Sequence, residues 1–168
     1  MKRAGLAILF AAIMSMSVLR SAAASEDAGY QGKKEMVKNL VNEAADLIRT
    51  KGQDGIDIIT DEKGKFNKGD IYIFVTSGET GADLVNPAFR VIEGLPVENY
   101  PDSDTRAAQM TIVNAVKDLD TAWVEYLWPK PGQTKTSRKV AYLRKVMING
   151  KTRIVGAGFY PESDYPKS

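Results

Sequence analysis

Two residue types are missing from this sequence: its 168 residues contain no cysteine and no histidine. Without cysteine, the fold cannot be stapled by disulfides. Without histidine, it lacks the side chain that most often serves as general base and metal ligand near neutral pH. Because these absences exclude much enzyme chemistry, we expect a protein that is not an enzyme and that holds no metal or other cofactor.

Neither sign of charge is in large excess. The chain carries 23 basic and 21 acidic residues, a formal net charge of +2. Three of the basic residues, Lys2, Arg3 and Arg20, lie close to the N-terminus, and without them 20 basic residues face 21 acidic ones. A net charge of about −1 gives no general attraction to a polyanion. We therefore expect no nucleic-acid partner.

One apolar run, from Ala4 to Leu19, follows a charged start and precedes the small residues Ala22-Ala23-Ala24. This order is typical of a secretory signal peptide. We expect residues 1–24 to be a signal peptide that is cleaved after about Ala24, and residues 25–168 to form one periplasmic or secreted domain. An uncleaved membrane anchor is the alternative, which the run disfavours because a spanning helix needs about 20 apolar residues.

Three antiparallel strands are predicted in the last third of the chain, over residues 123–128, 138–148 and 153–160. The first should end at Pro129-Lys130-Pro131-Gly132, where prolines remove backbone donors and glycine permits a positive φ. The second runs into Asn149-Gly150, the dipeptide preferred in a two-residue type I′ hairpin. In the third, Gly156 and Gly158 share one face, where their missing side chains leave room for a ligand or a close-packed helix.

Apolar residues at three- and four-residue spacing predict two amphipathic helices that pack on this sheet. The first should end at Lys51-Gly52, and its stripe is Met36, Val37, Leu40, Val41, Ala44, Leu47 and Ile48. The second should be capped by Asp102-Ser103-Asp104, and its stripe is Ala108, Ile112, Val113, Val116 and Leu119.

A strand and a hairpin are predicted between the two helices. Residues 53–70 are polar and should form a loop with one turn of helix. Asp70 to Thr76 is β-branched and aromatic on both faces, so it should be a central strand that is covered on both sides. Ala82 to Val85 should return antiparallel to it and end at Asn86-Pro87. Residues 88–102 should form a long surface loop that could cover a site.

Five segments match a known family: Phe66 to Val75, Asn86-Pro87, Trp123 to Pro131, Lys139 to Tyr142 and Val155 to Tyr160. In these segments, and in the order of its elements from about Glu35 to Tyr160, the chain resembles the single Cache domain, the PAS-like extracytoplasmic sensor module of bacteria. The resemblance implies an α+β fold in which a long N-terminal helix and a second helix pack on a curved antiparallel sheet of about five strands.

The same resemblance implies a function. It is to the small-ligand Cache type of chemoreceptors and histidine kinases, so we expect a sensor that binds a small organic acid or similar ligand. Occupancy would then be signalled through a membrane-bound histidine kinase or chemoreceptor. Such sequences usually have His-Pro where this one has Asn86-Pro87, so proton-linked sensing at that position is not expected.

The candidate site is a pocket for a small carboxylate. Tyr126 and Trp128 share a face of their strand, and Lys139 lies early in the facing strand, where its charge could neutralise a carboxylate while its stem packs on the rings. Arg90, in the covering loop, could close over an anion. The candidate ligand-binding residues are Tyr72, Phe74, Asn86, Arg90, Tyr126, Trp128, Lys139 and Tyr142.

Two alternatives remain at this point. Strict strand parity places Lys139 and Tyr142 on opposite faces, so a joint role requires a β-bulge between them. The aromatic residues could also be ordinary core, with Lys139 exposed and Arg90 a solvated loop residue. In that case the protein is structural, or interacts with a partner, and has no small ligand.

Overall fold

The computed structural model describes residues 5–61 and 64–161, and the side chains of residues 27–61 and 64–161. The chain divides into two compact units, Met1–Glu35 and Met36–Ser168. The expected cleavage after Ala24 falls outside the residues whose side chains are described and stays a prediction. No helix in the described part of the chain combines the length and the apolar character needed to cross a membrane.

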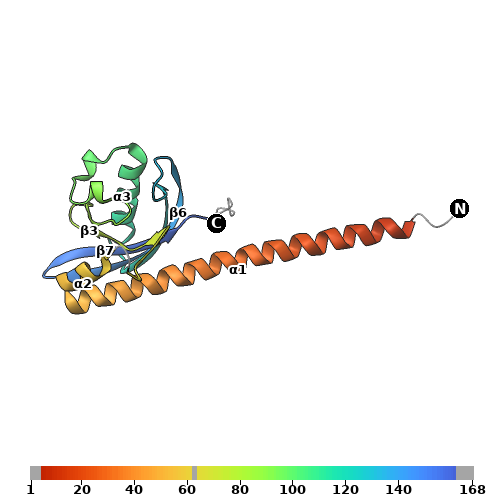
Figure 1. Ribbon diagram of the computed structural model, residues 1–168, viewed down its shortest axis with the longest axis horizontal. Coiled ribbons are helices and arrows are strands. Elements are labelled where there is room, and N and C mark those ends of the chain that lie inside the picture. Colours follow the sequence, from red (N-terminus) through yellow and green to blue (C-terminus); the bar gives the residue numbers. More distant parts are fainter. Residues whose placement is uncertain (1–4, 62–63, 162–168) are drawn as a thin grey trace. The chain divides into compact units, whose positions relative to one another are not determined.

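The second unit is built on a five-stranded antiparallel sheet with the strand order β4-β3-β7-β6-β5 (Figure 1). Its strands are β3 (Phe74–Ser77), β4 (Asp83–Val85), β5 (Thr121–Pro129), β6 (Thr136–Ile148) and β7 (Lys151–Phe159). A separate two-stranded ribbon pairs β1 (Asn67–Lys68) with β2 (Ile71–Tyr72). The expected α+β fold with about five antiparallel strands is confirmed.

The two-residue hairpin between β6 and β7 is confirmed. Ile148 pairs with Lys151, and the two residues between them, Asn149 and Gly150, have φ angles of 50° and 74°. A type I′ turn needs positive φ at both positions, which asparagine and glycine tolerate. The long β6–β7 pair that results is the frame to which the other strands attach.

Two helix ends lie where local signals predict: the C-terminus of α1 (Gly5–Lys51) and the N-terminus of α3 (Ser103–Ala115). Helix α1 ends as expected before Gly52, which has φ 61°, and α2 (Gln53–Ile59) follows it. Two 3-10 turns, η1 (Arg90–Ile92) and η2 (Val97–Asn99), precede α3. Asp102 caps α3, because its carboxylate accepts a hydrogen bond from the Thr105 N–H.

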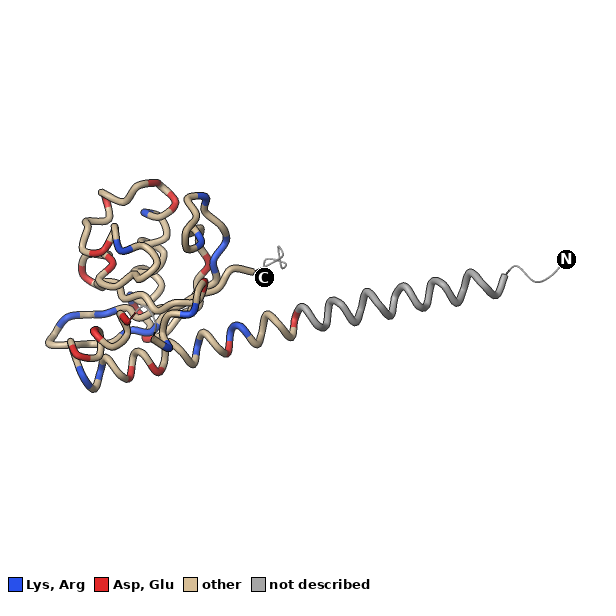
Figure 2. Tube along the Cα trace, viewed as in Figure 1, with Lys and Arg blue, Asp and Glu red and all other residues tan. Residues whose placement is uncertain are grey.

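The sheet of the second unit is covered on both faces (Figure 1). Ile112 of α3 packs in one cluster with Ala141 and Leu143 of β6. Arg144 of β6 points to the other face, where its Nη2 donates to Asp46 Oδ1 of α1 at 3.1 Å. Basic and acidic residues are interspersed along this unit and do not gather by sign (Figure 2).

Four expectations about the fold are wrong. Met36 is 56% exposed, because the buried stripe of α1 follows Val37 and Val41 instead. Leu119 is 57% exposed, because α3 ends at Ala115, before the predicted stripe does. The strand predicted over residues 70–76 is divided at Ile73, where the chain leaves the β1–β2 ribbon and joins the main sheet. Residues 53–59 form a complete short helix where a single turn was expected.

Candidate functional site

A small cavity lies between the sheet and α3. It is formed by residues from β2, β3, β4, β5, β6 and α3, together with Asn86: Tyr72, Phe74, Asp83, Asn86, Gln109, Ile112, Tyr126, Trp128 and Lys139. Its volume is about 10 Å³, which is about the least that holds one water molecule. Any larger ligand must therefore displace side chains of the wall.

Two glycines of β7 make room for the side chains that form the cavity floor. A Cβ at Gly158 would lie 3.0 Å from Lys139 Cε and 2.6 Å from the carbonyl oxygen of Val140. A Cβ at Gly156 would lie 2.3 Å from Cζ of Phe74. The space that the two glycines were expected to leave for a ligand or a helix is therefore occupied by the stem of Lys139 and the ring of Phe74.

Lys139 is the central charge of the cavity and is only 1% exposed. Its Nζ lies 4.0 Å from the ring centroid of Tyr72 and 5.4 Å from that of Tyr160, both within range of a cation–π interaction. Among the described residues, its polar contacts are limited to such aromatic faces, with no ion pair or hydrogen bond. Burial lowers the pKa of Lys139 to about 7, although the charges of Asp83 and Asp70 oppose the shift.

A buried carboxylate, Asp83, holds together the other side of the cavity. Its Oδ1 accepts hydrogen bonds from Thr76 Oγ1 and Gln109 Nε2, both at 2.9 Å, and its Oδ2 accepts one from Asn86 Nδ2 at 2.7 Å. The backbone N–H of Asp83 donates to the hydroxyl of Tyr100 at 2.9 Å. Burial raises the pKa of Asp83 to about 6, although the three donors oppose the shift.

Asp83 and Gln109 are part of the site but were not among the residues predicted from the sequence. Both carried a signal, since each is a polar residue at an apolar position of a regular pattern. In β4, Asp83 and Val85 are buried on either side of the exposed Leu84, so Asp83 takes an inward position of the strand. Gln109 lies beside Ala108 on the buried stripe of α3. A polar side chain at such a position must find hydrogen-bond partners, and here the two bind each other.

Four buried polar atoms of the cavity wall have no hydrogen-bond partner within the described part of the chain. They are the acceptors Asn86 Oδ1 and Gln109 Oε1, the donor Trp128 Nε1, and the hydroxyl of Tyr72, which can donate and accept. Buried polar groups in folded proteins are nearly always paired, and an unpaired one costs about 1–3 kcal/mol. Their concentration around one cavity suits the binding of a polar molecule.

Six of the eight candidate residues line the cavity: Tyr72, Phe74, Asn86, Tyr126, Trp128 and Lys139. The burial of Lys139 also contradicts the alternative in which that lysine is exposed. The other two candidates lie elsewhere. Arg90 is exposed and donates to the carbonyl oxygen of Thr60 at 3.4 Å.

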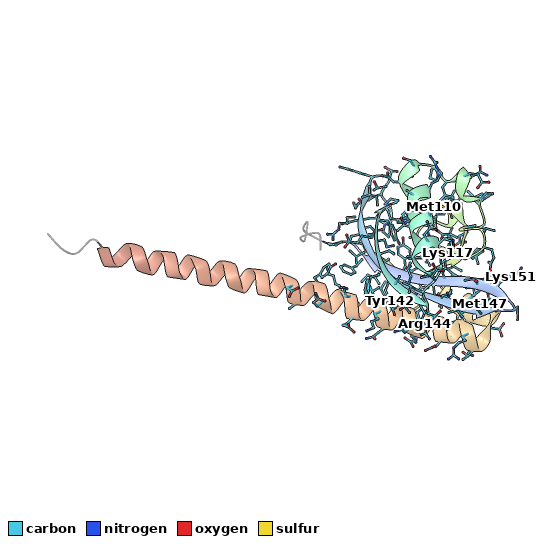
Figure 3. All side chains as sticks on the ribbon, turned by 180° about the vertical axis from the view of Figure 1, so that it is seen from behind. Met110, Lys117, Tyr142, Arg144, Met147 and Lys151 are labelled. Atoms are coloured by element: carbon cyan, nitrogen blue, oxygen red, sulfur yellow. The ribbon has the colours of Figure 1, made fainter. Side chains whose placement is uncertain are left out.

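Tyr142 lies on the α1 face of the sheet, where its ring packs against Trp123 with 5.1 Å between centroids. It shares this side of β6 with Arg144 (Figure 3). The β5–β6 and β6–β7 ladders run in continuous register past Lys139 and Tyr142. The bulge that a joint role required is absent from these described strands, so strict parity separates the two residues.

The segment before α3 covers the cavity at Trp128. The ring of Phe89 meets Trp128 edge to face at 5.8 Å, and Tyr126 meets it from β5 at 6.1 Å. Ile92 and Tyr100 are buried in the same cluster. The expectation of a surface segment that covers the site is thus met, with Ile92 and Tyr100 as its buried residues.

The fold and sequence match known sensor domains. The family model described as Single Cache domain 2 matches residues 12–162. None of the curated proteins matches the chain.

Three solved structures share its fold. A Cache chemosensory domain studied for carboxylic acid recognition is 22% identical, with a TM-score of 0.62 over 80% of this chain and 97% of that one. A methyl-accepting chemotaxis protein from Vibrio parahaemolyticus RIMD 2210633 is 15% identical, with a TM-score of 0.64 over 83% of this chain and 96% of that one. The periplasmic sensor domain of a chemotaxis protein is 20% identical, with a TM-score of 0.53 over 84% and 96%.

Proposed function

Because this chain belongs to the Single Cache domain 2 family of sensor domains, we propose that it is an extracytoplasmic sensor that binds a small carboxylate in the cavity around Lys139. It acts by binding and not by catalysis. The observation that carries the proposal is the buried ammonium group of Lys139, which has aromatic faces around it but no anion in contact with it among the described side chains. A buried charge is costly unless it is paired, and a carboxylate ligand would pair it.

The rest of the wall suits the same ligand. Trp128 Nε1 is a second buried donor without a partner in the described residues, and it can hydrogen-bond a carboxylate oxygen. The rings of Tyr72 and Phe74 can pack on a short apolar part of the ligand. Support also comes from the similar Cache domain that was studied for carboxylic acid recognition.

Binding is best tested by thermal unfolding of the purified protein at pH 6.5 with a series of small monocarboxylates. A ligand at 100 times its Kd should stabilise the fold by about 2.7 kcal/mol, or roughly 5–10 °C in Tm for a domain of this size. Lys139→Met keeps the apolar stem and removes the charge, so it should lower the affinity by about 1.5–3 kcal/mol. Lys151→Met, at the exposed start of β7, is the matched control and should bind like the wild type.

A second candidate function, a structural or interaction protein with no small ligand, is favoured by the small volume of the cavity. If the protein has this function, no carboxylate should change its Tm. Trp128→Ala would then act only as a core truncation and lower stability by roughly 3–5 kcal/mol. An absence of any thermal shift across the series would therefore favour this candidate over the sensor.

Export and signalling complete the proposal. Residues 1–24 direct the chain out of the cytoplasm, and residues 25–168 remain as a periplasmic or secreted sensor that acts through a membrane-bound chemoreceptor or histidine kinase. Mass spectrometry of the protein from its own host should then find Ser25 or a near neighbour at the N-terminus. A mature chain that begins at Met1 would contradict the export signal.

A further inference from the structure

Asp83 fixes the orientation of two amide side chains in the cavity wall. An ionised carboxylate can only accept hydrogen bonds, so each amide that binds it must present its NH2 group. Asn86 does so at Oδ2 and Gln109 at Oδ1. The carbonyl oxygen of each amide is therefore left for something else.

Those two carbonyl oxygens, Asn86 Oδ1 and Gln109 Oε1, are buried and have no partner among the described residues. Asn86 is 2% exposed and Gln109 1% exposed, so water at the surface does not serve them. The same cavity holds the donors Trp128 Nε1 and Lys139 Nζ, and the hydroxyl of Tyr72, which can donate and accept. The wall therefore offers both acceptors and donors to whatever occupies the cavity.

A plain alkyl carboxylate matches only half of this wall. Its oxygens accept from Lys139 and Trp128, but at neutral pH it has no donor for the two amide oxygens. A buried acceptor left unsatisfied weakens binding, and sites built to hydrogen-bond a donor discriminate strongly against analogues that lack it. The wall thus favours a ligand that carries a donor as well as a carboxylate.

We propose that the ligand is a small carboxylate that also bears a hydrogen-bond donor, a hydroxyl or an ammonium group, and that Asn86 and Gln109 are the residues that select for this donor. Asp83 is a positioning residue, because it acts through the two amides. The inference rests on the proposed carboxylate function and specifies its ligand class.

A ligand with a hydroxyl donor and a ligand with an ammonium donor differ in net charge. The wall already holds one group of each sign, Asp83 and Lys139. A hydroxy acid adds one negative charge to this pair, whereas an amino acid adds none. Both forms satisfy the amide oxygens, so a direct comparison of ligands decides which of them the site prefers.

Four three-carbon acids that differ only at position 2 test the inference: propionate, lactate, alanine and pyruvate. Their affinities for the full chain are measured by titration calorimetry at pH 7, with both enantiomers of lactate and alanine. Lactate or alanine should bind at least about tenfold more tightly than propionate and pyruvate, which have no donor at that position.

If propionate or pyruvate binds as tightly as lactate and alanine, the inference is overturned while carboxylate binding stands. If none of the four acids binds, the inference and the proposed function fall together. Preference for lactate over alanine identifies the donor as a hydroxyl, and the reverse identifies it as an ammonium group. Either preference supports the inference.

A variant of Gln109 tests whether its amide produces the preference for donor-bearing acids. Gln109→Met has a similar length and no carbonyl, so the preference for the donor-bearing acid should fall about tenfold while propionate affinity changes little. Gln133→Met, in the exposed turn after β5, is the matched control and should keep the preference. If the folded Gln109→Met variant keeps the preference for the donor-bearing acid, Gln109 does not select for the donor. If this variant does not fold, the comparison of the four acids on the wild type decides alone.

Discussion

Carboxylate affinity should fall as the pH rises above 7, because the ligand needs the charged form of Lys139. Burial lowers the pKa of this lysine to about 7 in the ligand-free protein. Above that pH the folded protein gives up the proton, and a carboxylate can bind only the fraction that keeps it. That fraction is about one half at pH 7 and about one hundredth at pH 9, so the apparent Kd should rise about fiftyfold between them.

Other titrating groups of the cavity do not produce this dependence. Burial raises the pKa values of Tyr72 and Tyr126 well above the usual tyrosine value, so both phenols stay neutral through this range. The pKa of Asp83 is about 6, so this carboxylate is ionised from pH 7 upward. A small carboxylic acid is also fully ionised above pH 7. The slope between pH 7 and pH 9 therefore reports Lys139.

Titration calorimetry at pH 7, 8 and 9 measures this slope, and buffers of different ionisation enthalpy measure the proton taken up on binding. Lys139→Met should bind more weakly and with no slope. Lys151→Met removes one exposed charge at the start of β7 and should keep the full slope. A wild-type Kd that is the same at pH 7 and pH 9 would refute the assignment of Lys139 to the binding site.

Three further predictions concern stability, measured as the free energy of unfolding in urea. Asp83 has a pKa of about 6 in the folded protein, against an ordinary value of 3.8. Because the folded state binds this proton more tightly, the free energy of unfolding should increase as the pH falls from 6 towards 4. The variant Asp83→Asn should lack that increase. Gly156→Ala would place a Cβ 2.3 Å from the ring of Phe74 and should cost about 1–3 kcal/mol, and an unchanged midpoint would contradict this packing. Gly150→Val puts a β-branched residue at φ 74° and should cost on the order of 1–3 kcal/mol, so equal stability would mean that the turn tolerates it.

Local rules predicted the parts of this fold that depend on a few neighbouring residues. The turn at Asn149-Gly150, the end of α1 before Gly52 and the Asp102 cap of α3 each need only one or two side chains and the backbone angles that those permit. The division of a predicted strand at Ile73 could not be found in this way. It depends on pairing with β1 before this residue and with β4 and β7 after it, and β7 lies about 80 residues further along the chain.

The candidate site shows the same limit. Strand parity placed Tyr126 and Trp128 on one face of their strand, and the structure confirms this because parity is a local property. Lys139 joins them because it pairs with Tyr126 across the β5–β6 ladder. The parity rule also separated Tyr142 from Lys139, and a site that included both required a β-bulge between them. Because the ladders run in continuous register past both residues, the parity rule holds and Tyr142 lies on the other face.

The burial of Lys139 illustrates what a single sequence leaves open. A lysine in a strand next to aromatic residues is usually exposed, and it becomes buried only if a neighbouring strand gives space to its stem. Here that space comes from Gly158, nineteen positions away, where even a methyl group would meet Lys139 Cε at 3.0 Å. The glycine and the lysine are thus one feature of the fold, because the first permits the burial that lowers the pKa of the second. Lys139 and Gly158 lie diagonally across the β6–β7 pair, because Val140 pairs with Phe159 and Ala141 with Gly158. The burial of this lysine therefore depends on the register between two strands, which a single sequence does not give.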